Sequence, residues 1–225
     1  MNRKIKTILI TIIFLCATSG FCLSEQLFPP PIYPGSDNVP DGSINKMPVT
    51  VLTLGNYYIR LEITLLVDVK NRIKSGVIQH QGDASEYVQW LCYTIPDGLE
   101  SQRIWIASSE MGGGKVDVVI AERISDTLNI NKYCPVLPNI YRPVKMDRNI
   151  WLGTKIEELD NSLGKPLFER GGLRIYDYFG KKTLPDKESA DNVVTMVDYD
   201  EISSLAVKVK DGKIVILWAS KGTSY

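Results

Sequence analysis

The sequence has very few of the residues that carry enzyme chemistry. Its 225 residues include a single histidine, His80, and four cysteines. His80 lies between two glutamines, without the serine or cysteine signature of a nucleophile, and this indicates a surface or loop histidine rather than a catalytic base. One histidine also gives a zinc ion too few ligands. We therefore expect no metal, no cofactor and no enzyme activity.

An excess of positive charge is absent as well. The whole chain has 26 basic and 26 acidic residues. The first 24 residues, which we interpret as a signal peptide, hold three basic and no acidic residues, so the remainder has 26 − 3 = 23 basic against 26 acidic and a net charge of −3. A weakly acidic chain without a basic block is poorly suited to nucleic acid or anionic lipid. We expect neither as a partner.

Long apolar runs are missing except at the N-terminus. Basic residues precede the apolar run Thr7–Ala17, which is too short to span a bilayer comfortably, and small residues follow it. This order predicts a secretory signal peptide over residues 1–24, cleaved before Glu25. The protein would then be periplasmic or secreted, with no integral membrane segment after cleavage. An uncleaved anchor helix is the alternative.

The N-terminal cysteines raise a separate question of lipidation. Leu15 precedes Cys16 and Phe21 precedes Cys22. A lipidation signal has a small residue at that position, so the pattern disfavours a lipid anchor without settling the matter.

Removal of the signal peptide leaves two cysteines, Cys92 and Cys134. An even pair in an exported chain predicts one disulfide, because the compartment is oxidising. Two unrelated buried thiols are the alternative.

Residues 25–47 contain five prolines together with Gly, Ser, Asn and Asp. This composition predicts a Pro-rich extended or disordered arm. Pro29–Pro31 is typical of a polyproline helix and could be a ligand for a groove in another protein, although spacers more often have this composition.

The folded part is expected to begin near Pro48. Residues 49–63 predict a β-hairpin around Gly55-Asn56, and the next apolar residues recur at helical spacing up to a stop at Gly76. Residues 86–95 are β-branched and aromatic and predict a strand, but Asp83–Glu86 has the form of a capping box and leaves a helix open. Two further strands are predicted on either side of Met111–Gly114.

The stretch 151–166 contains Gly164-Lys165 and invites comparison with a phosphate-binding loop. Thr154 and Glu157 have capping-box spacing, and apolar residues recur along one helical face. Because Gly164 follows the helix, no free backbone N–H groups point at an anion there. The motif therefore predicts a helix that ends at Gly164.

The second half of the chain repeats the predicted element order of the first. After the helix come strands near residues 172–182, 201–209 and 213–222. From this we predict an α+β fold: a tandem duplication of a helix packed on an antiparallel three-stranded sheet, preceded by a β-hairpin. The two repeats would occupy residues 48–130 and 131–225.

The phrases "WLGTKIEELDNSLGKP" and "ISSLAVKVKDGKIVILWASKG" carry a family pattern. It runs apolar–x–Gly–[Met/Thr], short helix, Leu-Gly-x-Pro, and a curved sheet that ends in a Gly-Lys turn. The chain here resembles the SmpA/OmlA (BamE) and β-lactamase-inhibitor-protein superfamily over residues 149–221, and more loosely over 57–125. The first unit departs from it, with Ile63 in place of the glycine and no proline after Gly76.

The superfamily consists of exported, non-catalytic proteins that bind other proteins on a sheet. The resemblance therefore implies a protein-binding module whose partner protein is of unknown identity, in its most specific form an inhibitor or immunity protein for an exported enzyme or toxin. An envelope-assembly accessory protein of BamE type is one alternative. A small hydrolase that uses carboxylates from the two units is another. Carboxylates cluster at Glu157–Asp160 and at Asp198–Glu201, where we expect solvated surface.

Alternation along "LRIYDYF" assigns side chains to two faces of a strand. Leu173, Ile175, Asp177 and Phe179 are expected to face the helix, because this set is mostly apolar. The outward set is then rich in the residue types that anchor interfaces, and Trp218 joins it or the core. We predict four partner-binding residues: Arg174, Tyr176, Tyr178 and Trp218. Ordinary strand formers on a solvated face are the alternative.

Overall fold

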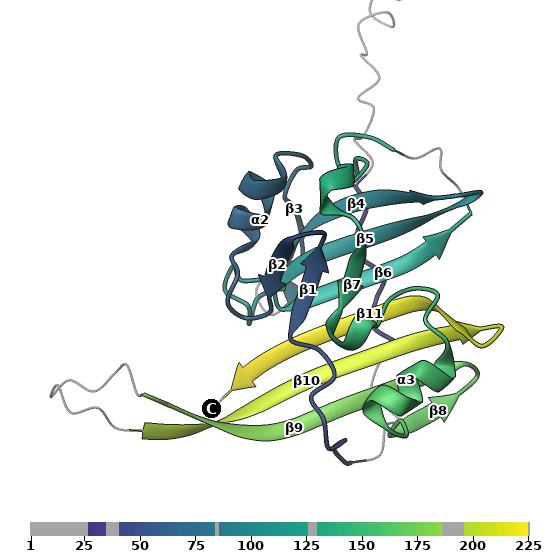
Figure 1. The fold of residues 1–225 in the computed structure, drawn as a ribbon. Helices are drawn as coiled ribbons and strands as arrows, with labels where there is room; N and C mark the ends of the chain where they lie inside the picture. The colour runs from purple at the N-terminus through teal and green to yellow at the C-terminus, as the bar shows by residue number, and fades with distance from the viewer. Residues whose placement is uncertain (1–26, 35–40, 84–85, 126–129, 186–195, 225) are drawn as a thin grey trace, which may run out of the picture.

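The computed structural model describes residues 27–34, 41–83, 86–125, 130–185 and 196–224, with only the backbone for residues 184 and 185 (Figure 1). The predicted signal peptide, its cleavage site and the two N-terminal cysteines lie outside the described residues. Within the described ranges, no helix is both long and apolar enough to cross a membrane.

Eight strands form one antiparallel sheet in the order β3-β4-β5-β6-β11-β10-β9-β8 (Figure 1). The strands of this sheet are β3 (Gln79–Gln81), β4 (Val88–Asp97), β5 (Glu100–Ser109), β6 (Val118–Ile124), β8 (Phe168–Arg170), β9 (Leu173–Pro185), β10 (Met196–Lys210) and β11 (Lys213–Ser224). The centre of the sheet is the pairing of β6 with β11, from Ile216 opposite Glu122 to Ser220 opposite Val118.

The remaining elements lie against one face of this sheet (Figure 1). A three-stranded antiparallel sheet has the order β2-β1-β7. Its strands and the helices are β1 (Val51–Leu54), β2 (Tyr57–Arg60), β7 (Val144–Met146), α2 (Leu66–Ile73), α3 (Ile156–Leu163), and the 3-10 turns η2 (Asn139–Tyr141) and η3 (Asp147–Asn149). The predicted hairpin at Gly55-Asn56 is confirmed as β1 and β2, and Gly55 has the positive φ of 58° that its turn requires.

The predicted fold class is wrong. The chain does not form two helix-on-three-strand units, because β6 and β11 pair and join β3 to β6 with β8 to β11 in one sheet of eight. β7, at residues 144–146, also pairs with β1, and so links segments that the sequence assigned to different repeats. The structure is mostly β, and its described residues include two α-helices of eight residues each.

α3 ends where the sequence predicted, whereas α2 ends before its predicted stop. α3 begins after Lys155, which makes no side-chain cap, while the hydroxyl of Thr154 instead accepts a hydrogen bond from the Trp151 backbone at 3.0 Å. The predicted capping box is therefore not formed. Gly164, with φ of 90°, ends α3 as expected. In α2 the left-handed position is Lys74, with φ of 58°, two residues before the predicted stop.

The main core lies between the large sheet and the elements that cover it. The helices contribute the residues of their predicted apolar faces, which are Leu66, Val69 and Ile73 from α2 and Leu159 and Leu163 from α3. Leu52, Leu54 and Ile59 of the small sheet pack into the same cluster. Residues 88–95 belong to β4, so the predicted strand is confirmed over the helix, although it begins two residues later than predicted.

A second core lies on the opposite face of the sheet. It is rich in aromatic rings and contains both cysteines, and its main members are Phe28, Trp90, Cys92, Trp105, Ile120, Cys134, Ile175 and Trp218. Phe28 comes from the predicted Pro-rich arm, so the described part of that arm is packed on the sheet and is not a free spacer. Both faces of the sheet are therefore covered.

The outer strands of the large sheet are short. β3 and β8 have three residues each. Beyond β3, the backbone of Thr94 in β4 bonds to Pro135 and Leu137, and beyond β8 the backbone of Ile44 bonds to Asp177 of β9. Past these points β9 and β10 continue together as a two-stranded ribbon, formed by residues 182–185 and 196–199, which extends from the body (Figure 1).

Candidate functional site

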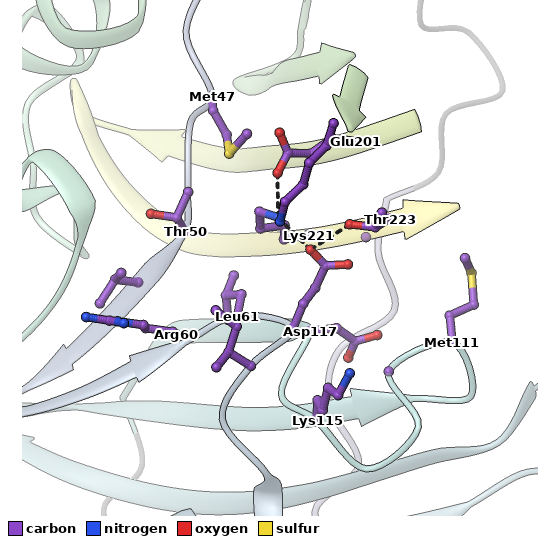
Figure 2. Close-up of a pocket in the computed structure, with 16 residues that line it drawn as sticks. Met47, Thr50, Arg60, Leu61, Met111, Lys115, Asp117, Glu201, Lys221 and Thr223 are labelled. Carbon is purple, nitrogen blue, oxygen red and sulfur yellow. Dashed lines mark hydrogen bonds and ion pairs between the residues drawn. The ribbon is translucent and has the colours of Figure 1, made fainter. Parts of the chain in front are cut away.

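A pocket of about 570 Å³ opens where the loop after β2 meets the ends of β6, β11 and β10 (Figure 2). Its floor continues the sheet face that elsewhere carries the main core. Along β11 the buried Ala219 is followed two residues later by Lys221, and along β10 the buried Leu205 is preceded four residues earlier by Glu201. The alternation of the strands thus places charged side chains on a face that is otherwise apolar.

Lys221 is the centre of this floor. Its side chain is 8% exposed, and its Nζ donates to Glu62 Oε2 at 2.5 Å and to Glu201 Oε1 at 2.9 Å (Figure 2). Burial lowers the pKa of Lys221, but the hydrogen bonds to the two carboxylates raise it, and the net shift is upward. The ammonium group is therefore charged at neutral pH and joins three separate segments.

Glu62 reaches Lys221 from a strained backbone. It is a non-glycine residue with φ of 64°, and its N–H donates to the carbonyl of Val116 at 2.7 Å. Its carboxylate accepts a second hydrogen bond, at 3.0 Å, from the hydroxyl of Thr223. A left-handed conformation at a non-glycine residue is uncommon and is often found at functional positions.

Asp117 forms a second buried carboxylate beside the first group. It is 6% exposed and accepts hydrogen bonds from the backbone N–H of Ser109 at 2.9 Å and from the Ser109 hydroxyl. Burial raises the pKa of Asp117, with a smaller increase from the nearby Glu62, while the bonds from Ser109 act in the opposite direction. The net effect is a raised pKa.

The mouth of the pocket is basic and partly apolar. Arg60, Lys115 and Lys182 are exposed, and no ion pair of these three side chains occurs among the described residues. The lining as a whole has four cations and three carboxylates, 4 − 3 = +1, and the carboxylates are already hydrogen-bonded inside. Ile63 and Met111, which are 66% and 76% exposed, add apolar surface at the same opening.

The structure places three of the predicted partner-binding residues differently from the prediction. Tyr176 is fully buried, and its hydroxyl donates to Asp160 of α3 at 3.0 Å. Arg174 donates to the same carboxylate at 2.7 Å and to Glu169 at 2.8 Å, and Tyr178 packs against the main core. The assignment of faces along β9 is therefore wrong, because Arg174 and Tyr176 bond to α3 and Tyr178 packs on the same side of the sheet.

The alternate residues of β9 point to the second core. Ile175 is fully buried in that core and Leu173 packs against it, whereas Phe179, further along the strand, is 54% exposed. The sequence suggested that one face of β9 is buried and the other solvent-exposed. Because both faces are covered, the polarity of the side chains could not show which face packs against the helix. α3 supplies a carboxylate for Arg174 and Tyr176, so a polar set faces the helix.

Trp218, the fourth predicted residue, lies on the opposite face from Tyr176. It is 7% exposed, and its Nε1 donates to the carbonyl of Pro31 at 3.3 Å. The four predicted residues therefore do not form one surface. Partner binding by them stays a prediction, and it requires that the segments covering them move.

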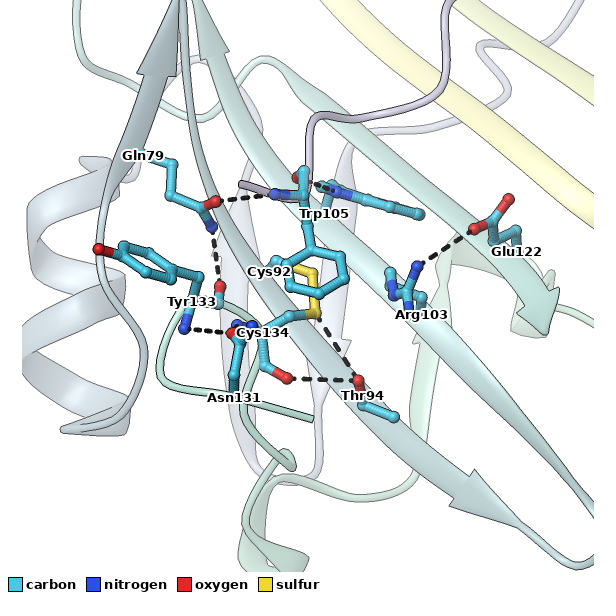
Figure 3. Close-up of a disulfide and its surroundings, with 10 residues drawn as sticks. Gln79, Cys92, Thr94, Arg103, Trp105, Glu122, Asn131, Tyr133 and Cys134 are labelled. Atoms are coloured by element: carbon cyan, nitrogen blue, oxygen red, sulfur yellow. Dashed lines mark hydrogen bonds and ion pairs between the residues drawn. A yellow bond between two sulfur atoms is a disulfide. The ribbon is translucent and has the colours of Figure 1, made fainter. Parts of the chain in front are cut away.

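The disulfide between Cys92 and Cys134 is confirmed (Figure 3). It ties the segment after β6 to β4, and the carbonyl of Cys134 lies 3.4 Å from the Thr94 hydroxyl. Next to it, Gln79 donates through Nε2 to the carbonyl of Tyr133 at 2.8 Å. The bridge thus fixes the wall of the second core nearest the N-terminal arm.

The other residues that the sequence singled out do not converge. His80 is exposed in β3, with its ring 6.0 Å from that of Tyr87. Asp198 bonds to Thr183 and Glu201 to Lys221, so the carboxylates of β10 point to different partners. Within the described ranges, no group of three or more His, Cys, Asp or Glu side chains is placed to hold a metal ion.

Sequence reasoning missed the pocket. A signal was present in "LWASKG", where Leu217 and Ala219 continue the buried face and Lys221 is the next residue on it. A lysine on a buried face needs a carboxylate partner. The two that it has, at positions 62 and 201, are far away in sequence.

We compared the chain with protein-family models, with curated proteins and with solved structures, and none of these comparisons gave a match. The superfamily resemblance stays a prediction from the sequence.

Proposed function

We propose that this chain is an exported, non-catalytic protein that binds another protein, and that it holds an acidic segment of that partner at the mouth of the pocket. The observation that carries the proposal is the set of three exposed cations, Arg60, Lys115 and Lys182, around an opening whose internal carboxylates are already bonded. Such a mouth attracts carboxylates although the whole chain is not basic.

The apolar rim supports a protein partner over a free inorganic anion. Ile63 and Met111 are large, exposed and adjacent to the cations. Interfaces combine an apolar centre with charged groups at the rim that steer the partner, and methionine is adaptable in such contacts. The ribbon contributes Lys182 of β9 to the lining.

The bonding inside the pocket supports binding rather than catalysis. Lys221 has a raised pKa and two carboxylate partners, so it is neither a neutral nucleophile nor a general base at pH 7. Glu62 and Glu201, in turn, are engaged by that ammonium group. An inhibitor or immunity protein for an exported enzyme is the most specific form of this proposal.

The proposal can be tested by capture from the exported proteins of the native host. Immobilised wild-type chain is compared with a Lys115→Glu/Lys182→Glu variant and with Lys165→Glu, a matched charge reversal at an exposed loop lysine outside the pocket. We expect the double variant to bind the captured partner about tenfold or more weakly, equal to about 1.4 kcal/mol or more, and Lys165→Glu to bind normally.

Two results would contradict the proposal. Equal binding by the folded double variant and the wild type would move the interface away from this pocket. Turnover of a glycan or peptide library by the purified chain, lost in a folded Glu62→Gln variant, would instead support the hydrolase alternative.

A further inference from the structure

Residues 27–34 of the N-terminal arm cross the second face of the sheet. The carbonyl of Phe28 accepts a hydrogen bond from Trp105 Nε1 of β5 at 2.9 Å, and the carbonyl of Pro31 accepts one from Trp218 Nε1 of β11 at 3.3 Å. Tyr33 packs on the same core further along. Two indole N–H groups, on strands separated by β6, therefore hold one extended segment.

The spacing of these contacts matches a polyproline II helix. Phe28, Pro29 and Pro30 each precede a proline, which favours extended backbone, and the prolines fix φ near −65°. Such a helix has about three residues per turn, so the carbonyls of residues 28 and 31 lie on the same side. The two indole N–H groups donate to the two carbonyl oxygens that one turn of this helix places on the same side.

The exposure of the side chains has the same period. Phe28 is buried and Pro31 half-buried, and Pro30 and Tyr33 are also half-buried. Residues 29 and 32, three apart, are exposed, and Ile32 is 91% exposed. Two of the three edges of the segment thus contact the sheet, and the third faces solvent.

Phe28 occupies a built socket at one end. Its ring lies under the Arg103 guanidinium, 4.8 Å from ring centroid to Cζ, and its N–H donates to Gln79 Oε1 at 3.1 Å (Figure 3). Gln79 is itself buried and is held by the carbonyl of Tyr133, next to the disulfide. The donors and the socket belong to the sheet, so they are positioned independently of the arm.

We propose that this face is a peptide-binding groove for proline-rich segments of a partner protein, and that the chain's own arm occupies it in cis. The groove, formed by Gln79, Arg103, Trp105 and Trp218, selects the pattern aromatic-x-Pro-Pro-x-aromatic, which residues 28–33 satisfy. Paired tryptophan N–H groups on polyproline carbonyls, beside an aromatic socket, are a general means of recognising such peptides. A partner segment binds by displacing the arm.

This site is separate from the pocket proposed above, since none of these residues lines it. Because the arm is tethered, it competes at an effective concentration of the order of millimolar. The groove is therefore closed to weak ligands and opens to a partner whose segment binds more tightly or at several points.

The test uses the full exported chain and a fluorescent peptide with the sequence of residues 27–34. A Phe28→Ala chain keeps the groove but weakens its own arm, and anisotropy titration should show about tenfold or more tighter peptide binding than to the wild type. Adding Trp218→Phe, which keeps a ring and removes the N–H donor, should weaken binding about fivefold.

Peptide variants provide matched controls. A peptide with Ile32→Ala, altered on the solvent edge, should bind like the parent, whereas Phe28→Ala or Pro31→Ala in the peptide should weaken binding about tenfold or more. Circular dichroism verifies that each chain is folded, and Tyr33→Ala at the other end of the arm replaces Phe28→Ala if that chain does not fold.

The proposal fails if a folded, arm-weakened chain does not bind the peptide at 1 mM, or binds the Pro31→Ala peptide equally well. A wild-type dimer that Phe28→Ala abolishes, detected by sedimentation, would assign the groove to arm exchange between copies and overturn the partner-peptide proposal.

Discussion

Replacing Lys221 with methionine tests the charged floor of the pocket. Methionine keeps most of the volume but removes the ammonium group, and Glu62 and Glu201 then lose the cation that joins them. The wild-type arrangement connects the loop after β2, strand β10 and strand β11. The substitution should therefore weaken the packing of three segments at one point.

The size of the effect follows from burial. Breaking a buried ion pair by removing one partner costs about 3–5 kcal/mol. The carboxylates of Glu62 and Glu201 are 22% and 14% exposed, so water screens them in part and the lower end, about 3 kcal/mol, is appropriate. For a domain of this size that loss corresponds to a fall in Tm of roughly 6–12 °C.

Thermal melting by circular dichroism measures the change. Lys213→Met, at an exposed lysine of the same strand, is the matched control and should melt like the wild type. A Lys221→Met/Glu62→Gln/Glu201→Gln variant should recover more than half of the loss, because no uncompensated charge remains. A fall of less than about 1 kcal/mol in Lys221→Met would show that the network does not stabilise the fold.

The structure also predicts the direction in which three further sets of substitutions change the stability of the fold. The raised pKa of Asp117 means that this carboxyl binds a proton more readily in the folded chain than in the unfolded chain. The stability of the wild type relative to an Asp117→Asn variant should therefore rise as pH falls from the folded-state pKa toward about 4. Parallel urea titrations of the two chains would measure this. Replacing Cys92 and Cys134 with alanine should cost about 4 kcal/mol in the chain-entropy model for a separation of 42 residues, measured by the urea midpoint. Tyr176→Phe should cost only about 1 kcal/mol, but Tyr176→Ala about 3–5 kcal/mol, by the same assay.

Each of these predictions has an outcome that contradicts it. A difference between Asp117→Asn and wild type that is the same from pH 7 to about pH 4 would mean that burial does not perturb this carboxyl. Two freely alkylated thiols in the purified protein would exclude the disulfide. A Tyr176→Ala chain as stable as the wild type would mean that the ring is not in the core.

Local patterns predicted the elements well and their assembly poorly. Gly55-Asn56 marks the first hairpin, and the spacing of Leu159 and Leu163 marks the buried face of α3. These features depend on neighbours in sequence, so the sequence reveals them. The pairing of β6 with β11 joins residues about a hundred positions apart, and the sequence of neither strand indicates which strand it pairs with.

The faces of β9 show a different limit. Alternation correctly separates Leu173 and Ile175 from Arg174 and Tyr176. The assignment of each set to a face relied on a contrast between a buried and a solvent-exposed face, and this contrast is absent because both faces are covered. The deciding group is Asp160, which stabilises Arg174 and Tyr176 beneath α3. For the pocket, the sequence marks Lys221 on a buried face but does not indicate its partners Glu62 and Glu201, which lie elsewhere in the chain.

The short outer strands also bear on how the protein behaves when concentrated. β3 and β8 offer three residues each, and the backbone beside them is occupied by residues 135–137 and by Ile44. Short and partly covered borders offer other chains little template for strand addition and so reduce ordered aggregation. The ribbon of residues 182–185 and 196–199 extends beyond these partly covered borders and exposes strand backbone. If one molecule adds a strand to another, that ribbon is where growth would begin.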